Sequence, residues 1–341
     1  MKALPNFSSL SLHNWAAKAL VITLLAATVA CGDGKNSQGT KNSTVRSGIL
    51  HLAADESLKP LIEAEIDSFE HGSPGAKIIA HYVSEAEAFR LFMTDSCTLI
   101  AVSRELSDKE LKYFKEEKKY TPKTTRFMVD GIVPIAHKER ADTSLTRDEL
   151  KRILTGQVKR WSELGRSIGK DVRSDSISIV FAGSGSSAYR FLQDSLLGGA
   201  AVLGRVFAVD STPAVVDYVA KHPNAIGFVG FAWFSDTDSP EAMALRERVR
   251  MLGVVNESGK AVNLSDNALH KLSSSREDLR YPLRRRMYLH NREAFTGLAL
   301  GFSSYVAAED GQRIIVKANL IPTSGIIRLM EVQEAPIPET Q

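Results

Sequence analysis

The hydrophobic pattern changes its period repeatedly along this 341-residue chain. Short apolar runs, such as residues 49–53, 77–83 and 98–102, are typical of buried strands. Residues 57–69 instead place apolar side chains three and four positions apart, which is the spacing of one helix face. Segments of the two kinds alternate through most of the chain. This alternation predicts an α/β fold with mainly parallel sheets flanked by helices.

Local signals predict where several elements begin. Ser107 and Thr146 are each followed three residues later by glutamate, a pattern that caps the N-terminus of a helix. Thr212, followed by a proline, predicts another cap and helix start. Residues 125–137 predict a long apolar strand that is broken at Asp130 by an Asp-Gly pair.

The first 30 residues have the pattern of an export signal. Two lysines are their only charges, and residues 19–30 form an apolar run too short to span a bilayer. Small residues precede Cys31, as at a bacterial lipoprotein cleavage site, so we expect a signal peptide over residues 1–30 and lipidation of Cys31. A plain secretory signal with a chance cysteine is the alternative. Residues 31–47 are too polar to order themselves and predict a flexible tether.

Composition argues against several functional classes. The formal net charge is +3 and no basic tract is interleaved with aromatic residues, so we expect no nucleic-acid partner. The histidines show no spacing typical of metal ligands, so we expect no metal and no cofactor. Cys97, the one other cysteine, is predicted to be a buried core residue rather than a catalytic thiol. Because the sequence shows no nucleophile with an adjacent general base, the chain is not expected to be an enzyme.

The segment richest in chemistry is a loop of glycine and serine between a predicted strand and a predicted helix. Glycine lets the backbone approach a ligand closely, and the first N–H groups of a helix have no intrahelical partner and favour negative charge. Serine hydroxyls add neutral donors. The loop therefore predicts an oxyanion site, although a simple cap and tight turn would give the same pattern; its residues are Gly183, Ser184, Gly185, Ser186 and Ser187.

Five segments, in the same order, resemble those of the PstS-like phosphate-binding proteins of ABC importers, which are periplasmic solute-binding proteins. They are DGIVPIAHKE (130–139), LTRDELKRILTGQVKRWSEL (145–164), VVDYVAKHPNAIGFVG (215–230), YPLRRRMYLH (281–290) and EDGQRIIVKANLIP (309–322). The resemblance implies a type II periplasmic-binding-protein fold with two lobes and two hinge crossings, near Ala136 and Pro282. Its implied boundaries are residues 48–135 with 283–335 for lobe 1, and 136–282 for lobe 2.

The resemblance also implies ligand residues. The family's first ligand loop corresponds to residues 54–61, where Ser57 keeps a hydroxyl and Leu58 follows it. Its second loop gives Ser103 as a donor and Arg104 as a cation, unless Arg104 is only a surface residue at the start of a helix. The third loop corresponds to the glycine and serine loop.

Two charged positions bear on the choice of anion. Asp130 is expected either to accept a proton from phosphate, which would reject sulfate, or to cap a turn with its neighbouring glycine. The family commonly carries an arginine and an acidic residue just before the third loop, where this chain has Val180-Phe181-Ala182, so one bidentate cationic contact is missing. Arg280 and Arg284 to Arg286 are expected to form a solvated or strand-edge face.

The resemblance implies a lipid-anchored solute-binding protein that captures inorganic phosphate for an ABC importer. Its implied partners are the anion, the membrane subunits of the importer and, through Cys31, the membrane itself. We expect a monomer that faces the periplasm. The missing arginine favours the alternative, which is a receptor or sensor for another oxyanion that has diverged from phosphate transport.

Overall fold

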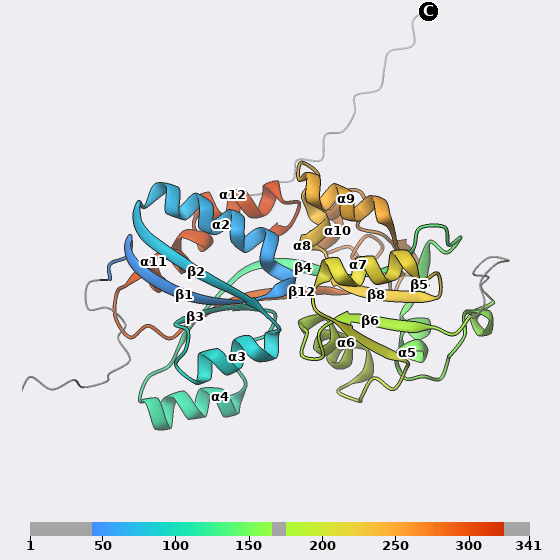
Figure 1. Ribbon diagram of the computed structural model, residues 1–341, viewed down its shortest axis with the longest axis horizontal. Helices are drawn as coiled ribbons and strands as arrows, with labels where there is room; N and C mark the ends of the chain where they lie inside the picture. The colour runs from blue at the N-terminus through green and yellow to red at the C-terminus, as the bar shows by residue number, and fades with distance from the viewer. Residues whose placement is uncertain (1–42, 166–174, 324–341) are drawn as a thin grey trace, which may run out of the picture. The chain divides into compact units, whose positions relative to one another are not determined.

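The computed structural model of the protein describes residues 43–165 and 175–323, which belong to one compact unit. Helices flank the strands on both faces, and β4 and β12 run between the two groups of strands (Figure 1). The predicted signal peptide, Cys31 and most of the predicted tether lie outside the described residues, as does the end of the predicted first lobe.

Thirteen strands occur in the described part of the chain. They are β1 (Ser47–Asp55), β2 (Gly75–Val83), β3 (Leu99–Val102), β4 (Lys123–His137), β5 (Ser144–Thr146), β6 (Ser178–Ala182), β7 (Val206–Val209), β8 (Ala225–Gly230), β9 (Val249–Met251), β10 (Gly253–Val255), β11 (Ala261–Val262), β12 (Arg284–Asn291) and β13 (Ile321–Pro322). Ten of them form one sheet, in which β1 pairs in parallel with β2 and β3, and β6 pairs in parallel with β7 and β8. The antiparallel pairings described for this sheet all involve β4 or β12.

Helices connect most of these strands. They are η1 (Glu56–Leu58), α2 (Lys59–Gly72), α3 (Glu85–Met93), α4 (Asp108–Tyr113), η2 (Phe114–Lys118), α5 (Arg147–Leu154), η3 (Trp161–Leu164), α6 (Ser187–Leu197), α7 (Thr212–Lys221), α8 (Ala232–Ser235), α9 (Pro240–Arg248), α10 (Ala268–Ser273), α11 (Leu298–Ala307) and α12 (Glu309–Lys317). The predicted α/β alternation is confirmed, including the first β-α-β unit made by β1, α2 and β2.

The predicted helix starts are confirmed in two cases and wrong in one. Ser107 and Thr146 each form a complete capping box. The cap of α7 is Ser211 rather than Thr212, because Ser211 accepts the N–H three residues on at 3.3 Å. Thr212 is already helical, and both its N–H and its hydroxyl donate to Glu56.

β4 passes without interruption from one group of strands to the other. Gly131 pairs with β12, and the next residue, Ile132, pairs with β8. The predicted break at Asp130 is therefore wrong. A Cβ on Gly131 would lie 2.9 Å from Leu264, so this glycine allows close packing instead of a turn. The change of partner comes earlier than the predicted lobe boundary after residue 135; the lobe boundaries remain a prediction.

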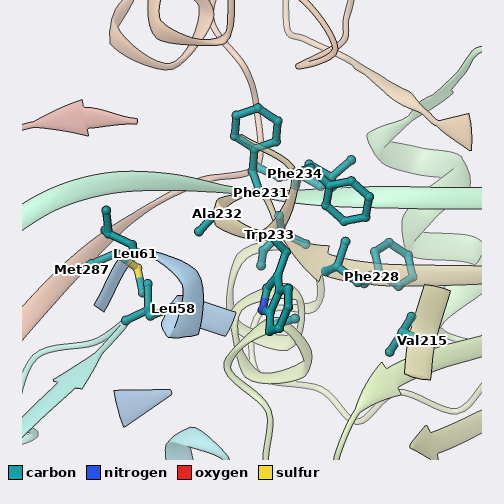
Figure 2. Close-up of a cluster of buried hydrophobic side chains, with 14 of the residues drawn as sticks. Leu58, Leu61, Val215, Phe228, Phe231, Ala232, Trp233, Phe234 and Met287 are labelled. Atoms are coloured by element: carbon teal, nitrogen blue, oxygen red, sulfur yellow. The ribbon is translucent and has the colours of Figure 1, made fainter. Parts of the chain in front are cut away.

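Leu58 lies in the hydrophobic core next to the start of α2. Figure 2 shows it with Leu61 of α2 and Met287 of β12, in a buried cluster that also contains Trp233 of α8. The indole N–H of Trp233 donates to the backbone carbonyl of Glu56 at 3.1 Å. The core therefore fixes the position of η1, the turn that ends β1.

Candidate functional site

Three donors meet on one carboxylate oxygen at the end of β1. Oδ1 of Asp55 accepts the N–H of Ser57 at 3.0 Å, which caps η1, and it also accepts the hydroxyl of Ser57. The hydroxyl of Ser187, at the start of α6, donates to the same oxygen at 2.9 Å. The local turn and a helix start far along the chain thus share a single buried acceptor.

Arg285 joins this cluster from β12. Its Nη2 donates to the hydroxyl oxygen of Ser57 at 2.8 Å and its Nη1 to that of Ser187 at 2.6 Å. Its Nε and Nη2 both donate to Oδ2 of Asp130, at 3.1 and 2.8 Å. A Cβ on Gly230 would lie 2.8 Å from Nη2, so the guanidinium needs a glycine beside it. Arg285 therefore supplies a cation to the site.

The prediction of a solvated arginine face is wrong for Arg285, whose exposed fraction is 3%. Successive side chains of a strand point to opposite faces, so Arg285 points inward while Arg286 is exposed as predicted. Arg284 is half-buried and donates to the carbonyl of Leu272 at 3.2 Å. Three consecutive arginines read as one surface feature in the sequence, although the strand divides them between two environments.

Burial controls the acidity of the site. It raises the pKa of Asp55, and the nearby carboxylate of Glu85 raises it further, while Arg285 acts in the opposite direction. Burial also raises the pKa of Asp130. The ion pair with Arg285 and the N–H groups of Gly131 and Ala232 lower it. Oδ1 of Asp130 is buried and has no hydrogen bond of good geometry to the described residues. Burial outweighs the ion pair and the N–H contacts, so the pKa of Asp130 stays above its usual value.

The glycine and serine loop divides its residues between several roles. Ser187 joins the cluster, whereas Ser186 caps α6 by accepting an N–H at 3.3 Å. Ser184 is exposed. The carbonyl of Gly185 accepts the N–H of Ala86, at the start of α3. The loop is thus both a helix cap and, through Ser187, part of the site.

Ser103 lies in a second cluster beside the first. Its N–H and hydroxyl donate to Oε1 of Glu85 at 2.7 and 2.8 Å, and Arg190 of α6 binds both residues. The Arg190 ion pair and the Ser103 hydrogen bonds outweigh burial and hold the pKa of Glu85 below its usual value. Arg104 faces elsewhere: it makes a bidentate ion pair with Glu110 at 2.8 Å. The structure therefore does not bring Arg104 to the serine cluster.

Two cavities differ sharply in size. The space among Asp55, Ser57, Ser186 and Ser187 is about 10 Å³. A neighbouring cavity of about 700 Å³ is lined by five arginines together with Ser103 and Tyr288; the arginines are Arg104, Arg126, Arg284, Arg285 and Arg286. The smaller space has room for about one water molecule in this structure, and the larger one places positive charge next to it.

Sequence reasoning identified Asp130 but missed five other charged residues in and around the site, which are Asp55, Glu56, Glu85, Arg190 and Arg285. Asp55 and Glu56 lie within the first ligand loop, where Asp55 replaces a serine of the family pattern and Glu56 stands at a variable position. That substitution was the available signal. No local pattern marks the other three, because each meets its partners only in the folded chain.

Other predictions concern chemistry outside this site. Cys97 is buried as predicted, and burial raises the pKa of its thiol to about 12, so it is not a reactive thiolate at neutral pH. Within residues 43–165 and 175–323 there is no group of three or more potential metal-ligating side chains. None of the helices in the same ranges is both long and apolar enough to span a membrane.

The chain is similar to known phosphate-binding proteins. The chain is 25% identical over 313 residues to the phosphate-binding protein PstS of Bacillus subtilis, covering 87% of this chain and 91% of that protein. It is 21% identical to a phosphate-binding protein PstS of Staphylococcus epidermidis, covering 85% of this chain and 84% of that one.

Solved structures show the same fold. A protein from Clostridium perfringens, described as a phosphate ABC transporter substrate-binding protein with bound phosphate, matches with a TM-score of 0.62 at 21% identity and covers 81% of this chain and 100% of its own. An ABC-type phosphate transport receptor from Vibrio cholerae gives 0.57 at 15% identity, covering 80% and 99%. The predicted two-lobed periplasmic-binding-protein fold is confirmed.

The sequence pattern of a family described as a PBP superfamily domain matches residues 36–310, which is most of the chain. Proteins of this kind bind solutes and are not enzymes. The chain belongs to the PBP superfamily.

Proposed function

We propose that this protein is an exported, non-catalytic receptor that captures inorganic phosphate for an ABC importer. One observation carries the proposal: the guanidinium of Arg285 and the hydroxyls of Ser57 and Ser187 converge on one buried point. A dehydrated oxyanion needs such preorganised donors to replace its bonds to water. The names of the relatives in Bacillus and Staphylococcus support phosphate as the anion.

Arg285 would supply the positive charge that is missing before the third loop. Residues 180–182 are Val-Phe-Ala and offer no cation, whereas Arg285 reaches the same helix start from β12. Asp130 lies beside it, and its buried Oδ1 has no hydrogen bond of good geometry to the described residues. Phosphate carries a proton at neutral pH and sulfate does not, so an acceptor at this place favours phosphate.

The other predicted ligand residues would reach the anion in different ways. Leu58, Gly185 and Ser186 would contribute through backbone groups near the cluster, and Ser184 through its hydroxyl after movement of the loop. Ser103 and Arg104 would contact the anion only if they exchanged their present carboxylate partners, Glu85 and Glu110.

The setting of the receptor is part of the same proposal. Cleavage after residue 30 and lipidation of Cys31 would hold a monomer at the membrane, facing the periplasm, where its closure is sensed by importer subunits. Movement of the two predicted lobes about β4 and β12 would open and close the site.

Calorimetric titration of the fragment from Ser47 onward, dialysed free of anions, tests the proposal. We expect binding of phosphate and arsenate and rejection of sulfate. Ser187→Ala should weaken phosphate binding about tenfold or more, because it removes a donor to a charged ligand. Ser195→Ala is the matched control, since this exposed serine on α6 donates only to the carbonyl of Phe191.

A folded fragment that binds no oxyanion would contradict the proposal, and so would unchanged phosphate affinity in the Ser187 variant. The second candidate, a receptor for another oxyanion, is favoured by the carboxylate of Asp55 among the donors. Preference for molybdate or another anion over phosphate in the same titration would establish it.

A further inference from the structure

The donors of the site are occupied by the protein's own carboxylates. Asp55 accepts the hydroxyls of Ser57 and Ser187, as an oxyanion would. Its neighbour Glu56 accepts the N–H and hydroxyl of Thr212 at the start of α7, each at 2.9 Å. Both acids belong to the turn that ends β1. This turn therefore presents negative charge to the starts of two helices, where anions are favoured.

The serine hydroxyls have no proton left for a ligand. Each accepts a hydrogen bond from Arg285 and donates its single proton to Asp55. A bound anion must therefore take both protons away from the carboxylate. The cluster as it stands satisfies Arg285, Ser57 and Ser187 without any ligand.

The cavity beside Asp55 is also too small for a bound anion. The cavity beside Asp55 measures about 10 Å³, which is about the room needed for one water molecule. A tetrahedral oxyanion has five heavy atoms and needs several times that volume. The side chain of Asp55 must move, or the lobes must part, before such an anion reaches Ser57 and Ser187.

The charges around Asp55 oppose an added anion. Glu56 in η1 and Glu85 at the start of α3 are acidic neighbours, and Glu85 is ion-paired with Arg190 of α6. Arg285 of β12 is the cation that contacts the serines, and it is already paired with Asp130 of β4. Arg285 thus faces two carboxylates, Asp55 and Asp130, before any ligand arrives.

We propose that Asp55 is an internal competitor for the anion, and that oxyanion capture at this site takes up a proton to neutralise its carboxylate. The inference rests on the proposed function and concerns how the same site is regulated. A proton from solvent adds to a carboxylate oxygen of Asp55, which then no longer holds both serine hydroxyls. The hydroxyls of Ser57 and Ser187 turn toward the entering anion, and Arg285 keeps its place between them.

The direction of the pH effect follows from burial. Because burial raises the pKa of Asp55, its protonated form becomes available at a higher pH than for an exposed aspartate. Protonation removes the competing charge, so anion affinity should increase as the pH falls through that pKa. Asparagine at this position is neutral at every pH and should remove the dependence.

The experiment is calorimetric titration with inorganic phosphate at pH 5 to 8, comparing the wild type with Asp55→Asn and Asp55→Ala. At pH 7.5 we expect both variants to bind phosphate about tenfold more tightly or better, and the difference to shrink toward pH 5. Asp67→Asn, which neutralises an exposed acid on α2, is the control and should behave as the wild type. The comparison at each pH cancels the titration of phosphate itself.

A second measurement counts protons. Titration at pH 8 in two buffers of different ionisation heat gives the protons taken up, and we expect the wild type to take up more protons per phosphate bound than Asp55→Asn, in which only phosphate itself can gain one. No greater uptake in the wild type, or a wild type as tight as Asp55→Asn at pH 7.5, would overturn the inference and leave the proposed function standing. Folded wild type and variants that bind no anion at any pH would overturn both.

Discussion

Replacing Arg285 with alanine will lower the free energy of unfolding by about 3 to 5 kcal/mol. The guanidinium is almost wholly buried, and it is ion-paired with Asp130 at 2.8 Å while donating to Ser57 and Ser187. Its loss leaves the carboxylate of Asp130 buried without compensation. Urea unfolding followed by circular dichroism measures the effect.

Arg286→Ala is the matched control, because this exposed neighbour on the same strand should change stability by less than about 0.5 kcal/mol. A double variant, Arg285→Met with Asp130→Asn, removes both charges and should recover much of the loss. Equal destabilisation by the two single arginine variants would show that the buried ion pair does not stabilise the fold.

Replacing Glu65 with methionine will stabilise the protein by about 3 kcal/mol at pH 7. Glu65 is fully buried on α2, and neither carboxylate oxygen has a hydrogen-bond partner among the described residues. Burial raises the pKa of this carboxyl from 4.5 to about 9, so the folded protein keeps it protonated at neutral pH. The unfolded chain releases that proton, which favours unfolding. Methionine has a similar size and no proton to lose.

The pH dependence gives this prediction its sign. The folded pKa is above the unfolded one, so the cost of Glu65 is absent below pH 4.5 and grows until about pH 9. The stability difference between Glu65→Met and the wild type should therefore widen over that range in urea unfolding. Glu63→Met, at an exposed position two residues earlier on α2, should show no such trend. A constant difference between pH 5 and 8 would contradict the assignment.

Much of the fold could be predicted because its signals are local. The apolar runs of β1 and β3, the helical spacing of α2 and the capping boxes at Ser107 and Thr146 each depend on residues close together in the chain. The break expected at Asp130 failed for a nonlocal reason. The following glycine serves packing against Leu264, which no window of sequence around Asp130 reveals.

The site could be predicted only in part. Ser57, Ser187 and Asp130 were identified from loop position and resemblance, and they do lie in one cluster. Arg104 was expected to be the cation, yet Glu110, six residues away, takes it by a bidentate ion pair. The cation that reaches the serines is Arg285, which the sequence placed within an exposed basic stretch.

The sequence by itself determined the α/β alternation, the capping boxes at two helix starts and the donors near Ser57 and Ser187, since periodicity and capping act over a few residues. Only the tertiary structure decided which charges meet. Asp55, Asp130 and Arg285 lie on three strands, and their pairing depends on the sheet order that brings β1, β4 and β12 together. In a buried site each charge takes the partner that the fold places beside it, because leaving it unpaired would cost several kcal/mol.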